Sequence, residues 1–345
     1  MLFEMIMRAC VDRAWQSQTL ALPNPSVACA VLSGNHEVLA LQVHTKAHTP
    51  HAEVLALRQA FNALSPTPYP KHIDPLDKES NYHFLAQNHS DLFKDCTLVV
   101  TLEPCNHFGK TPPCAALLEQ LRPKKVVIGA LEPSTKAKGG GDRLKKAGIE
   151  VLSGVLEQAC IDLLAPFTCL ESKGAFNLFK IAMRLDGDYL GKISGQESQN
   201  FTHNQRTIAD HLIISGKSVR TDRPTLNTRF ATPPYEGLCH VAILTRDKTP
   251  FESTIPLFSI KGRKVQICHE VKQLPLDTGF NVLEGGWGLL ASLQEHIDML
   301  LIHTSASLQA GHATHPRNKS LKTLRKRFLP LHSQILGQDI LAWLA

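Results

Sequence analysis

Short apolar runs, each about the length of one β-strand, recur along this 345-residue chain and constrain its fold more than any other feature. The first half contains SVACAVL, EVLALQVH, CTLVVTLE and KKVVIGAL, and stretches of helical periodicity separate the later runs. The turn signal SGNH between the first two runs predicts a hairpin. A second series, which includes DHLIISG, HVAILT and FNVLEGG, follows from about residue 175. Strands that alternate with helices are typical of α/β domains whose sheets contain parallel pairs.

The length of the chain favours two domains. We predict a first domain over residues 1–155, a connecting helix over 156–174 and a second domain over 175–345. Residues 62–95 are rich in Pro, Asn, His and Ser without a clear period, so we predict an irregular insertion there. Such an insertion is either a surface elaboration, or a lid or subunit contact. The basic run 325–327 is expected to be a solvated helix face.

The composition narrows the class of protein. No apolar run is long enough to span a membrane, and the charged N-terminal stretch MLFEMIMRACVDRAW predicts an amphipathic helix instead of a signal peptide. The net charge of +6 is modest, and the basic residues are dispersed apart from the segment RNKSLKTLRKR. This balance suits a phosphorylated small substrate and disfavours nucleic acid as a partner. The lack of these targeting features predicts a cytoplasmic location, where the nine cysteines, which form no repeating framework, are expected to be reduced thiols. A homo-oligomer is left open.

The stretch TLEPCNHFGKTPPC places Cys105 and Cys114 each directly after a proline. Upstream, TPHAEV puts His51 and Glu53 at the start of a predicted helix. One imidazole and two thiolates make three zinc ligands and leave a fourth position for water, which is the arrangement of a catalytic zinc. The sequence therefore predicts a metal site formed by His51, Cys105 and Cys114.

Glu53 lies two residues from His51 and is the predicted catalytic residue. Zinc lowers the pKa of a bound water, and the hydroxide that forms is a nucleophile at neutral pH. A carboxylate beside it can carry the proton to a leaving amine. The H-x-E and P-C pieces match the signature of zinc nucleobase deaminases, although eight residues separate the two cysteines here instead of two.

Three other interpretations compete with this one. His51 could be an ordinary helix-start histidine and the cysteines buried apolar fillers, because a single H-x-E is common. A structural zinc site would need a fourth protein ligand, for which His107 is the nearby candidate. A deaminase of nucleic acids would favour a short P-C-x-x-C spacing and a basic surface near the site, and neither is evident.

The same stretch resembles the PCSHxGxTPPC motif of the bacterial bifunctional riboflavin-biosynthesis family RibD, which joins a pyrimidine deaminase to a pyrimidine reductase. PNPSVACAV resembles the family's PNPxVGCV, and His44 matches a histidine just before HAE. The resemblance implies that Asn24, His44 and His107 contact the deaminase substrate. The family's DPNP loop reads EPST here, and the stretch from His51 to Cys105 is about 30 residues longer than the resemblance leads us to expect.

The resemblance also implies the fold and the reactions. It predicts an N-terminal cytidine-deaminase-like three-layer α/β/α domain with one Zn²⁺ per chain. This domain would remove an amino group from a diaminopyrimidinone ribosylamino phosphate. The C-terminal domain would be a dihydrofolate-reductase-like α/β domain that uses NADPH to reduce the ribosyl group to ribityl.

Three motifs carry the resemblance in the second half: KIAMRLDG, SVRTDRPTLNTR and VLEGGWG. No G-x-G-x-x-G follows a strand, so a Rossmann fingerprint is absent. By resemblance, NADPH would be bound by Ser218, Asp222, Gly285 and Gly286. The reductase substrate would be bound by Ser198, Leu226, Arg229 and Glu284.

The second half also departs from the family pattern. Asn200 replaces a tryptophan, and a Leu-Arg pair whose arginine contacts substrate reads Leu212-Ile213. The lost guanidinium would have to come from Arg206 or Arg220, or is absent. The alternative to a bifunctional enzyme is therefore a deaminase with a degenerate reductase domain.

Overall fold

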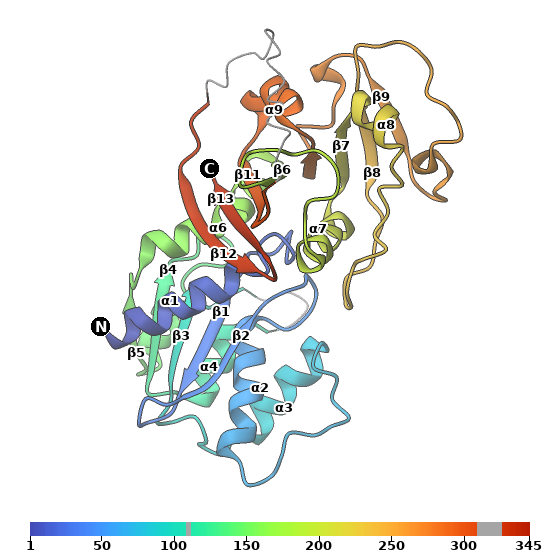
Figure 1. The fold of residues 1–345 in the computed structure, drawn as a ribbon. Helices are drawn as coiled ribbons and strands as arrows, with labels where there is room; N and C mark the ends of the chain where they lie inside the picture. The colour runs from blue at the N-terminus through green and yellow to red at the C-terminus, as the bar shows by residue number, and fades with distance from the viewer. Residues whose placement is uncertain (108–111, 309–325) are drawn as a thin grey trace. The chain divides into compact units, whose positions relative to one another are not determined.

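The computed structural model describes residues 1–107, 112–308 and 326–345 (Figure 1). The chain forms two compact units, Met1–Thr168 and Cys169–Ala345, and the division falls within helix α6 (Glu157–Lys173). Within the described ranges, no helix is both long enough and apolar enough to cross a membrane.

The first unit is built on a five-stranded sheet in the order β2-β1-β3-β4-β5. Strands β1 (Ala28–Leu32) and β2 (Val38–Val43) form the predicted antiparallel hairpin, and β3 (Thr97–Leu102) runs antiparallel to β1. Strands β4 (Lys125–Ala130) and β5 (Glu150–Ser153) continue in parallel with β3. Every residue of β1 and β3 is buried, which explains why apolar residues dominate both strands.

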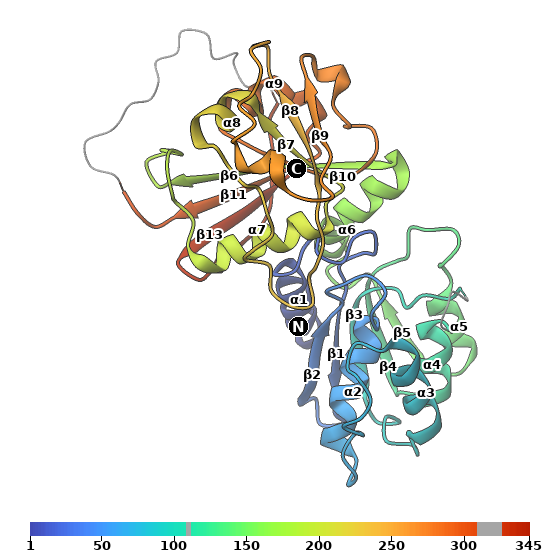
Figure 2. The same cartoon turned by 90° about the vertical axis from the view of Figure 1, so that its right-hand side faces the viewer.

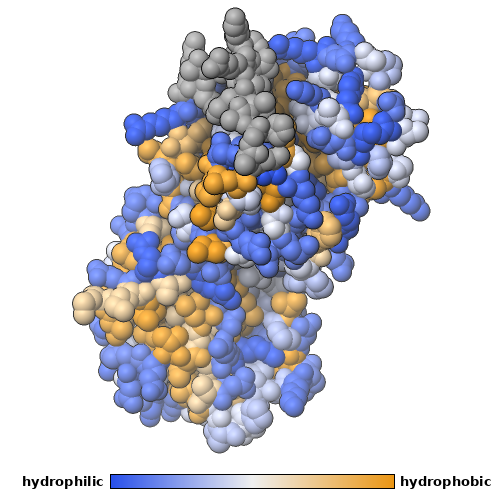
Figure 3. Space-filling model, in the orientation of Figure 1, coloured by the Kyte–Doolittle hydropathy of each residue, from blue (hydrophilic) through white to orange (hydrophobic). Residues whose placement is uncertain are grey.

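Helices cover both faces of this sheet and give the predicted three-layer domain (Figure 2). Helix α1 (Leu2–Trp15) packs on β1 and β3, and Cys10 of this helix donates to the Val99 carbonyl. Helix α2 (Ala52–Leu64) packs on β1 and β2 from the other side. Figure 2 shows α4 (Cys114–Leu121) and α5 (Gly140–Lys146) on the same side as α2. Figure 3 shows apolar residues gathered over α1, where Met1 and Met5 are exposed.

The prediction that residues 62–95 are irregular was wrong in part, because helix α3 (Lys78–Asn88) lies inside this segment. Its buried residues, Asn81, Tyr82 and Leu85, do not form an apolar stripe of helical period, so the pattern carried no signal. Asp77 caps the helix by accepting from the amides of residues 79 and 80. The rest of the segment is anchored through Asn81, which donates to the carbonyls of residues 74 and 77 and accepts from Arg58.

The second unit contains an eight-stranded sheet in the order β12-β13-β11-β6-β10-β7-β8-β9. The strands from β11 to β9 are parallel, as the alternating pattern predicts; they are β6 (Ala175–Arg184), β7 (His211–Ser215), β8 (His240–Leu244), β9 (Val265–Cys268), β10 (Gly279–Glu284) and β11 (Met299–Ser305). Helices α7 (Gln196–Ile208), α8 (Gly216–Asp222) and α9 (Trp287–Leu293) lie between these strands in the chain. This sheet, with helices between its strands, confirms the α/β class expected for the second domain.

The sequence analysis did not predict two strands at one edge of this sheet. Strands β12 (Pro330–Leu336) and β13 (Asp339–Leu344) form a hairpin that pairs antiparallel with β11. Strand β12 mixes polar and apolar residues without alternation, and none of its residues is buried, which masks it in the sequence. The prediction that the basic run 325–327 is a solvated helix face was wrong for its described part, because Lys326 and Arg327 lie in neither a helix nor a strand. Arg325 lies outside the described residues.

Replacing Asn81 with alanine tests how the 62–95 segment is held. The substitution removes three hydrogen bonds from a residue with no exposed surface. We expect the free energy of unfolding to fall by about 2–3 kcal/mol, because the carbonyls of residues 74 and 77 and the Arg58 guanidinium lose a buried partner. Denaturant unfolding measures the loss, and Asn88→Ala on the exposed end of α3 is the matched control. A loss no larger than that of the control would contradict this account.

Candidate functional site

His51, Cys105 and Cys114 come together in the first unit, at the ends of three elements. His51 is the residue before α2, Cys105 follows the end of β3, and Cys114 opens α4. One ligand atom from each residue lies within 4.8 Å of the other two. Both sulfur atoms approach the same ring nitrogen, with Cys114 Sγ at 3.4 Å and Cys105 Sγ at 3.7 Å from His51 Nδ1.

Local backbone geometry sets this cluster. The backbone N–H of Cys114 donates to Cys105 Sγ at 3.3 Å, which ties the start of α4 to the turn after β3. The prolines before the cysteines have no N–H, and Pro113 holds an extended conformation at the N-cap of α4. Because α2 and α4 both begin at the cluster, their partly positive ends favour thiolate sulfur there.

The protonation of the cluster reflects this proximity. Hydrogen bonding from Cys114, ahead of the opposing effect of burial, lowers the pKa of Cys105 to about 4. Burial lowers the pKa of His51, but the hydrogen bond and charge of Cys105 outweigh it and raise that pKa to about 9. The protein alone therefore carries a thiolate beside an imidazolium. A divalent cation would take the place of the ring proton, since its ligands must be deprotonated.

Glu53 lies in the first turn of α2, with only 4% of its surface exposed. Burial raises the pKa of its carboxyl group, so a proton is held there more readily than in water. His107, in contrast, is exposed and lies outside the metal-ligand cluster. Among the described residues, no fourth protein ligand completes the cluster. One imidazole and two sulfurs with an open position fit a catalytic zinc better than a structural one.

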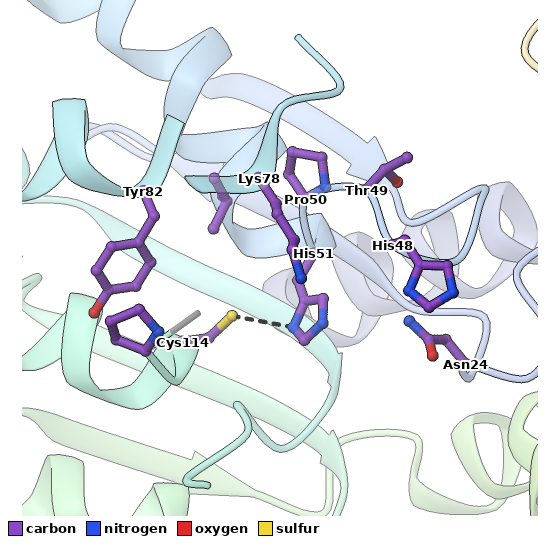
Figure 4. Close-up of a pocket in the computed structure, with 10 residues that line it drawn as sticks. Asn24, His48, Thr49, Pro50, His51, Lys78, Tyr82 and Cys114 are labelled. Atoms are coloured by element: carbon purple, nitrogen blue, oxygen red, sulfur yellow. Dashed lines mark hydrogen bonds between the residues drawn. The ribbon is translucent and has the colours of Figure 1, made fainter. Parts of the chain in front are cut away.

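A polar pocket adjoins the cluster (Figure 4). Asn24, His51 and Cys114 line it, and the side-chain amide of Asn24 lies 3.1 Å from Nε2 of His44. The other ring nitrogen of His44 is 2.9 Å from the Pro50 carbonyl oxygen. Burial, followed by the neighbouring His51, lowers the pKa of His44 to about 4, so this ring is neutral at pH 7 and orients the Asn24 amide.

The turn that carries Cys105 rests on a buried carboxylate that the sequence analysis missed. Glu103 accepts from the backbone N–H of Gly141 at 2.8 Å and from that of Glu132 at 3.1 Å. Gly140 permits this close packing, because a Cβ there would lie 1.9 Å from the Pro104 carbonyl oxygen. The sequence signal for this support is the GGG triplet after EPST, because its glycines pack against the turn that carries Cys105.

In the second unit, Glu284 ends β10 and stands opposite Lys180 of β6 in the parallel register. Arg206 of α7 donates two hydrogen bonds to the Glu284 carboxylate, of 2.7 and 2.6 Å. Burial would raise the pKa of Glu284, but the Arg206 charge outweighs it and lowers that pKa to about 2. Burial lowers the pKa of Lys180. The three groups form a charged site beneath the carboxyl edge of the sheet, where ligands of α/β folds bind.

Of the other predicted reductase residues, some lie together at one edge of the sheet, and the rest are either exposed or buried. Ser218 lies in α8, directly after β7, and Gly285 and Gly286 follow β10, the neighbouring strand. These three therefore share one edge of the sheet. Asp222 is exposed at the end of α8, and Arg229 is exposed and bonded to Asn227. Two further residues are buried: Ser198 within α7, and Leu226, whose carbonyl accepts from Arg263.

The departures from the family pattern also have clear positions. Ile213 is fully buried in a core cluster with Phe179 and Leu283, so its side chain faces no ligand. Arg220 stacks on Phe251 and pairs with Asp247. Of the two arginines considered as substitutes, Arg206 is the one that reaches Glu284.

Comparisons with known proteins agree with the geometry. Residues 3–130 match the family model "Cytidine and deoxycytidylate deaminase zinc-binding region". Riboflavin biosynthesis protein RibD of Synechocystis is 32% identical over 64% of the chain, and that of Aquifex aeolicus is 31% identical over 65%. These matches span 54% and 57% of the two relatives, so the chain covers between half and three fifths of their length.

Solved structures share the fold over nearly the whole chain. A diaminohydroxyphosphoribosylaminopyrimidine deaminase/5-amino-6-(5-phosphoribosylamino)uracil reductase from Thermotoga maritima has 21% identity and a TM-score of 0.64. RibD of Acinetobacter baumannii has 24% identity and a TM-score of 0.61. Each comparison covers 99% of this chain and 98% of the other. Both units therefore have the fold of these two-domain proteins.

Replacing Cys114 with serine tests the ligand set. Serine keeps the helix start but replaces a thiolate with a poor zinc ligand, so we expect the zinc content per chain to fall by most of its value. His107→Ala is the control, and it should leave the zinc content unchanged because His107 lies outside the cluster. Metal analysis of both purified proteins gives the answer. Loss of zinc in the His107 variant would mean that this residue is a fourth ligand.

The Arg206–Glu284 pair predicts a dependence of stability on pH. The pKa of Glu284 is depressed from 4.5 to about 2, so its contribution is fully present above pH 4.5 and is lost as the pH falls towards 2. A shift of this size corresponds to roughly 3 kcal/mol. We expect Glu284→Gln to remove this part of the acid slope in unfolding experiments between pH 5 and pH 2.5. Identical slopes for the variant and the original protein would show that the pair does not titrate as described.

Proposed function

We propose that this chain, a relative of the RibD riboflavin-biosynthesis proteins with the same two-unit fold, is a bifunctional enzyme. Its first unit would deaminate a diaminopyrimidinone ribosylamino phosphate. Its second unit would reduce the ribosyl group of the product to ribityl with hydride from NADPH. The observation that carries the first activity is the cluster of His51, Cys105 and Cys114 with Glu53 beside it.

The cluster supports a zinc-dependent deamination. When bound, zinc would supply a water nucleophile at neutral pH and positive charge at the reacting centre. Glu53 takes the proton of the attacking water on its carboxylate and delivers it to the leaving amine, which departs as ammonia. The buried position of Glu53 suits this role, because burial raises the pKa of its carboxyl group towards neutral pH.

The pocket wall supports recognition of a pyrimidine. Asn24 presents a side-chain amide whose orientation is set by neutral His44, and His44 is itself held by the Pro50 carbonyl. A fixed amide can pair with the donor and acceptor edge of a pyrimidinone ring without losing freedom on binding. We therefore assign substrate contact to Asn24 and a positioning role to His44. His107, which is exposed, would contact substrate only at the outer end of the site.

The second unit supports a reductase less directly. Gly285 and Gly286 at the end of β10 and Ser218 after β7 would hold the phosphates of NADPH, and Asp222 would assist them. The substrate would be held beside Glu284, Leu226 and Arg229, with Ser198 behind them in α7. Arg206 would supply the guanidinium that Ile213 cannot.

A specific observation favours the second candidate, a deaminase whose reductase unit does not bind NADPH. The ring of Tyr189 lies against Gly286, so closely that a Cβ there would be 2.3 Å from it. The ring thus occupies the Cβ side of this glycine. If the phosphates of NADPH approach Gly286 from that side, Tyr189 would have to move.

The cellular setting is part of the proposal. The thiols of Cys105 and Cys114 must be reduced to bind zinc, and all nine cysteines are free, which suits a cytoplasmic location. The partner would be a phosphorylated pyrimidine, with neither nucleic acid nor a membrane involved.

Zinc-loaded protein supplied with the diaminopyrimidinone ribosylamino phosphate and NADPH tests both activities at once. We expect ammonia release, and we expect Glu53→Gln to lower its rate by at least about 100-fold, with zinc content unchanged, because the proton carrier is lost. NADPH oxidation, followed by absorbance, should depend on prior ammonia release. Tyr82→Phe, which changes the pocket without touching Glu53, controls for general damage to the site.

The outcomes separate the candidates. Ammonia release without NADPH oxidation would favour the deaminase with a degenerate reductase unit. Retained ammonia release in Glu53→Gln would remove the proposed role of that carboxylate. A zinc-loaded protein that releases no ammonia would refute the proposed deaminase activity.

A further inference from the structure

Helix α3, which the sequence did not predict, brings two side chains from the 62–95 segment to the pocket beside the metal cluster. Lys78 and Tyr82 both line this pocket, together with His51 and Cys114. They are four residues apart on the helix and therefore share one face of it. Figure 4 shows the Lys78 side chain reaching towards His51, with the Tyr82 ring on the other side of Cys114. The segment is thus part of the wall of the site.

The amine of Lys78 has no counterion among the described residues. Its side chain is half-buried, and among the described residues none forms an ion pair or hydrogen bond with it. The nearest acidic residues along the chain are engaged elsewhere or exposed: Asp77 caps α3, and Glu79 is exposed on another face of the helix. A lysine that lines a pocket without a counterion is suited to bind an anion.

The position of helix α3, which carries this lysine, is fixed by packing that does not depend on a ligand. Asn81 anchors α3 to the residues before it, and α3 packs against both α2 and α4. Tyr82 is 4% exposed, and its hydroxyl has no hydrogen-bond partner in the described structure. Since Asp77 already satisfies the first amides of α3, the helix end is not the anion site. Among the described residues that line the pocket, Lys78 is the one lysine or arginine, and its charge is what they offer to an anion.

We infer that Lys78 binds the phosphate group of the deaminase substrate, and that α3 is the element that selects a phosphorylated pyrimidine over the corresponding riboside. The inference rests on the proposed deaminase function, and it adds a specificity-determining residue from outside the metal motif. The phosphate would lie on the α2–α3 side of the pocket, while the pyrimidine faces Asn24 and the metal cluster. Lys78 does not touch the reacting atoms, so its effect falls on binding.

The decisive experiment compares Lys78→Ala with the original protein on two substrates, the ribosylamino phosphate and its dephosphorylated form. We expect KM for the phosphorylated substrate to rise about 10- to 100-fold, because a charge-assisted hydrogen bond to phosphate is lost. We expect kcat to change little and the kinetics on the dephosphorylated substrate to stay the same. Lys78→Arg should restore most of the affinity for the phosphorylated substrate.

Controls exclude a structural effect. Lys71→Ala removes an exposed lysine from the same segment and should leave KM unchanged. Zinc content and the denaturation midpoint should be equal in all variants. An equal loss on both substrates, or no loss on the phosphorylated one, would overturn the inference.

A binding measurement keeps this inference separate from the proposed activity. The line width of the ³¹P NMR signal of inorganic phosphate, titrated with zinc-loaded protein, reports binding without turnover. We expect broadening with the original protein and with Lys71→Ala, and a large reduction with Lys78→Ala. If the protein releases no ammonia, the proposed function fails, but this result still decides whether Lys78 forms a phosphate site. Equal broadening by all three proteins would overturn it.

Discussion

The contact between the Cys114 amide and the Cys105 sulfur is the interaction on which the first unit's site depends. It fixes the end of a buried strand against the start of a helix, and His51 at the start of a second helix completes the cluster. Two sulfurs and a ring nitrogen within 4.8 Å repel one another once deprotonated, so the arrangement favours a cation that neutralises them. The fold sets the positions of the three side chains, and a bound metal ion would offset the charge of their deprotonated forms.

The second unit solves a similar problem in a different way. There, Glu284 is neutralised by Arg206 through a two-point contact, with Lys180 close by, and no metal is needed. A buried pair of this kind is expensive to break, because removing one partner leaves the other charge without compensation. A substrate at this site would therefore bind beside a charge pair that is already formed, and would gain from orientation more than from new ion pairing.

The sequence could predict a residue's role where the residue acts through its own chemistry. It could not predict the role where the residue acts through contacts with residues distant in the chain. His51, Cys105, Cys114 and the strand runs were predictable because their residue types and spacing carry the signal. Helix α3 was not, because its cap and its Asn81 contacts replace an apolar stripe. Glu103 and Arg263 were missed because they act on the backbone of residues far along the chain. The sequence left open whether Arg206, Arg220 or neither replaces the guanidinium lost at Ile213, and the structure pairs Arg206 with Glu284 and Arg220 with Asp247.

The same distinction explains where substrate selection can reside in the first unit. The metal ligands and Glu53 are constrained by the reaction, so they cannot also be adjusted to the remainder of a substrate. Groups around the pocket are free of that constraint. Helix α3 is held by hydrogen bonds to its own segment and by contacts with α2 and α4, so its pocket face can present Lys78 without altering the sheet or the cluster. A segment without a catalytic motif can thus determine which molecule the catalytic motif receives.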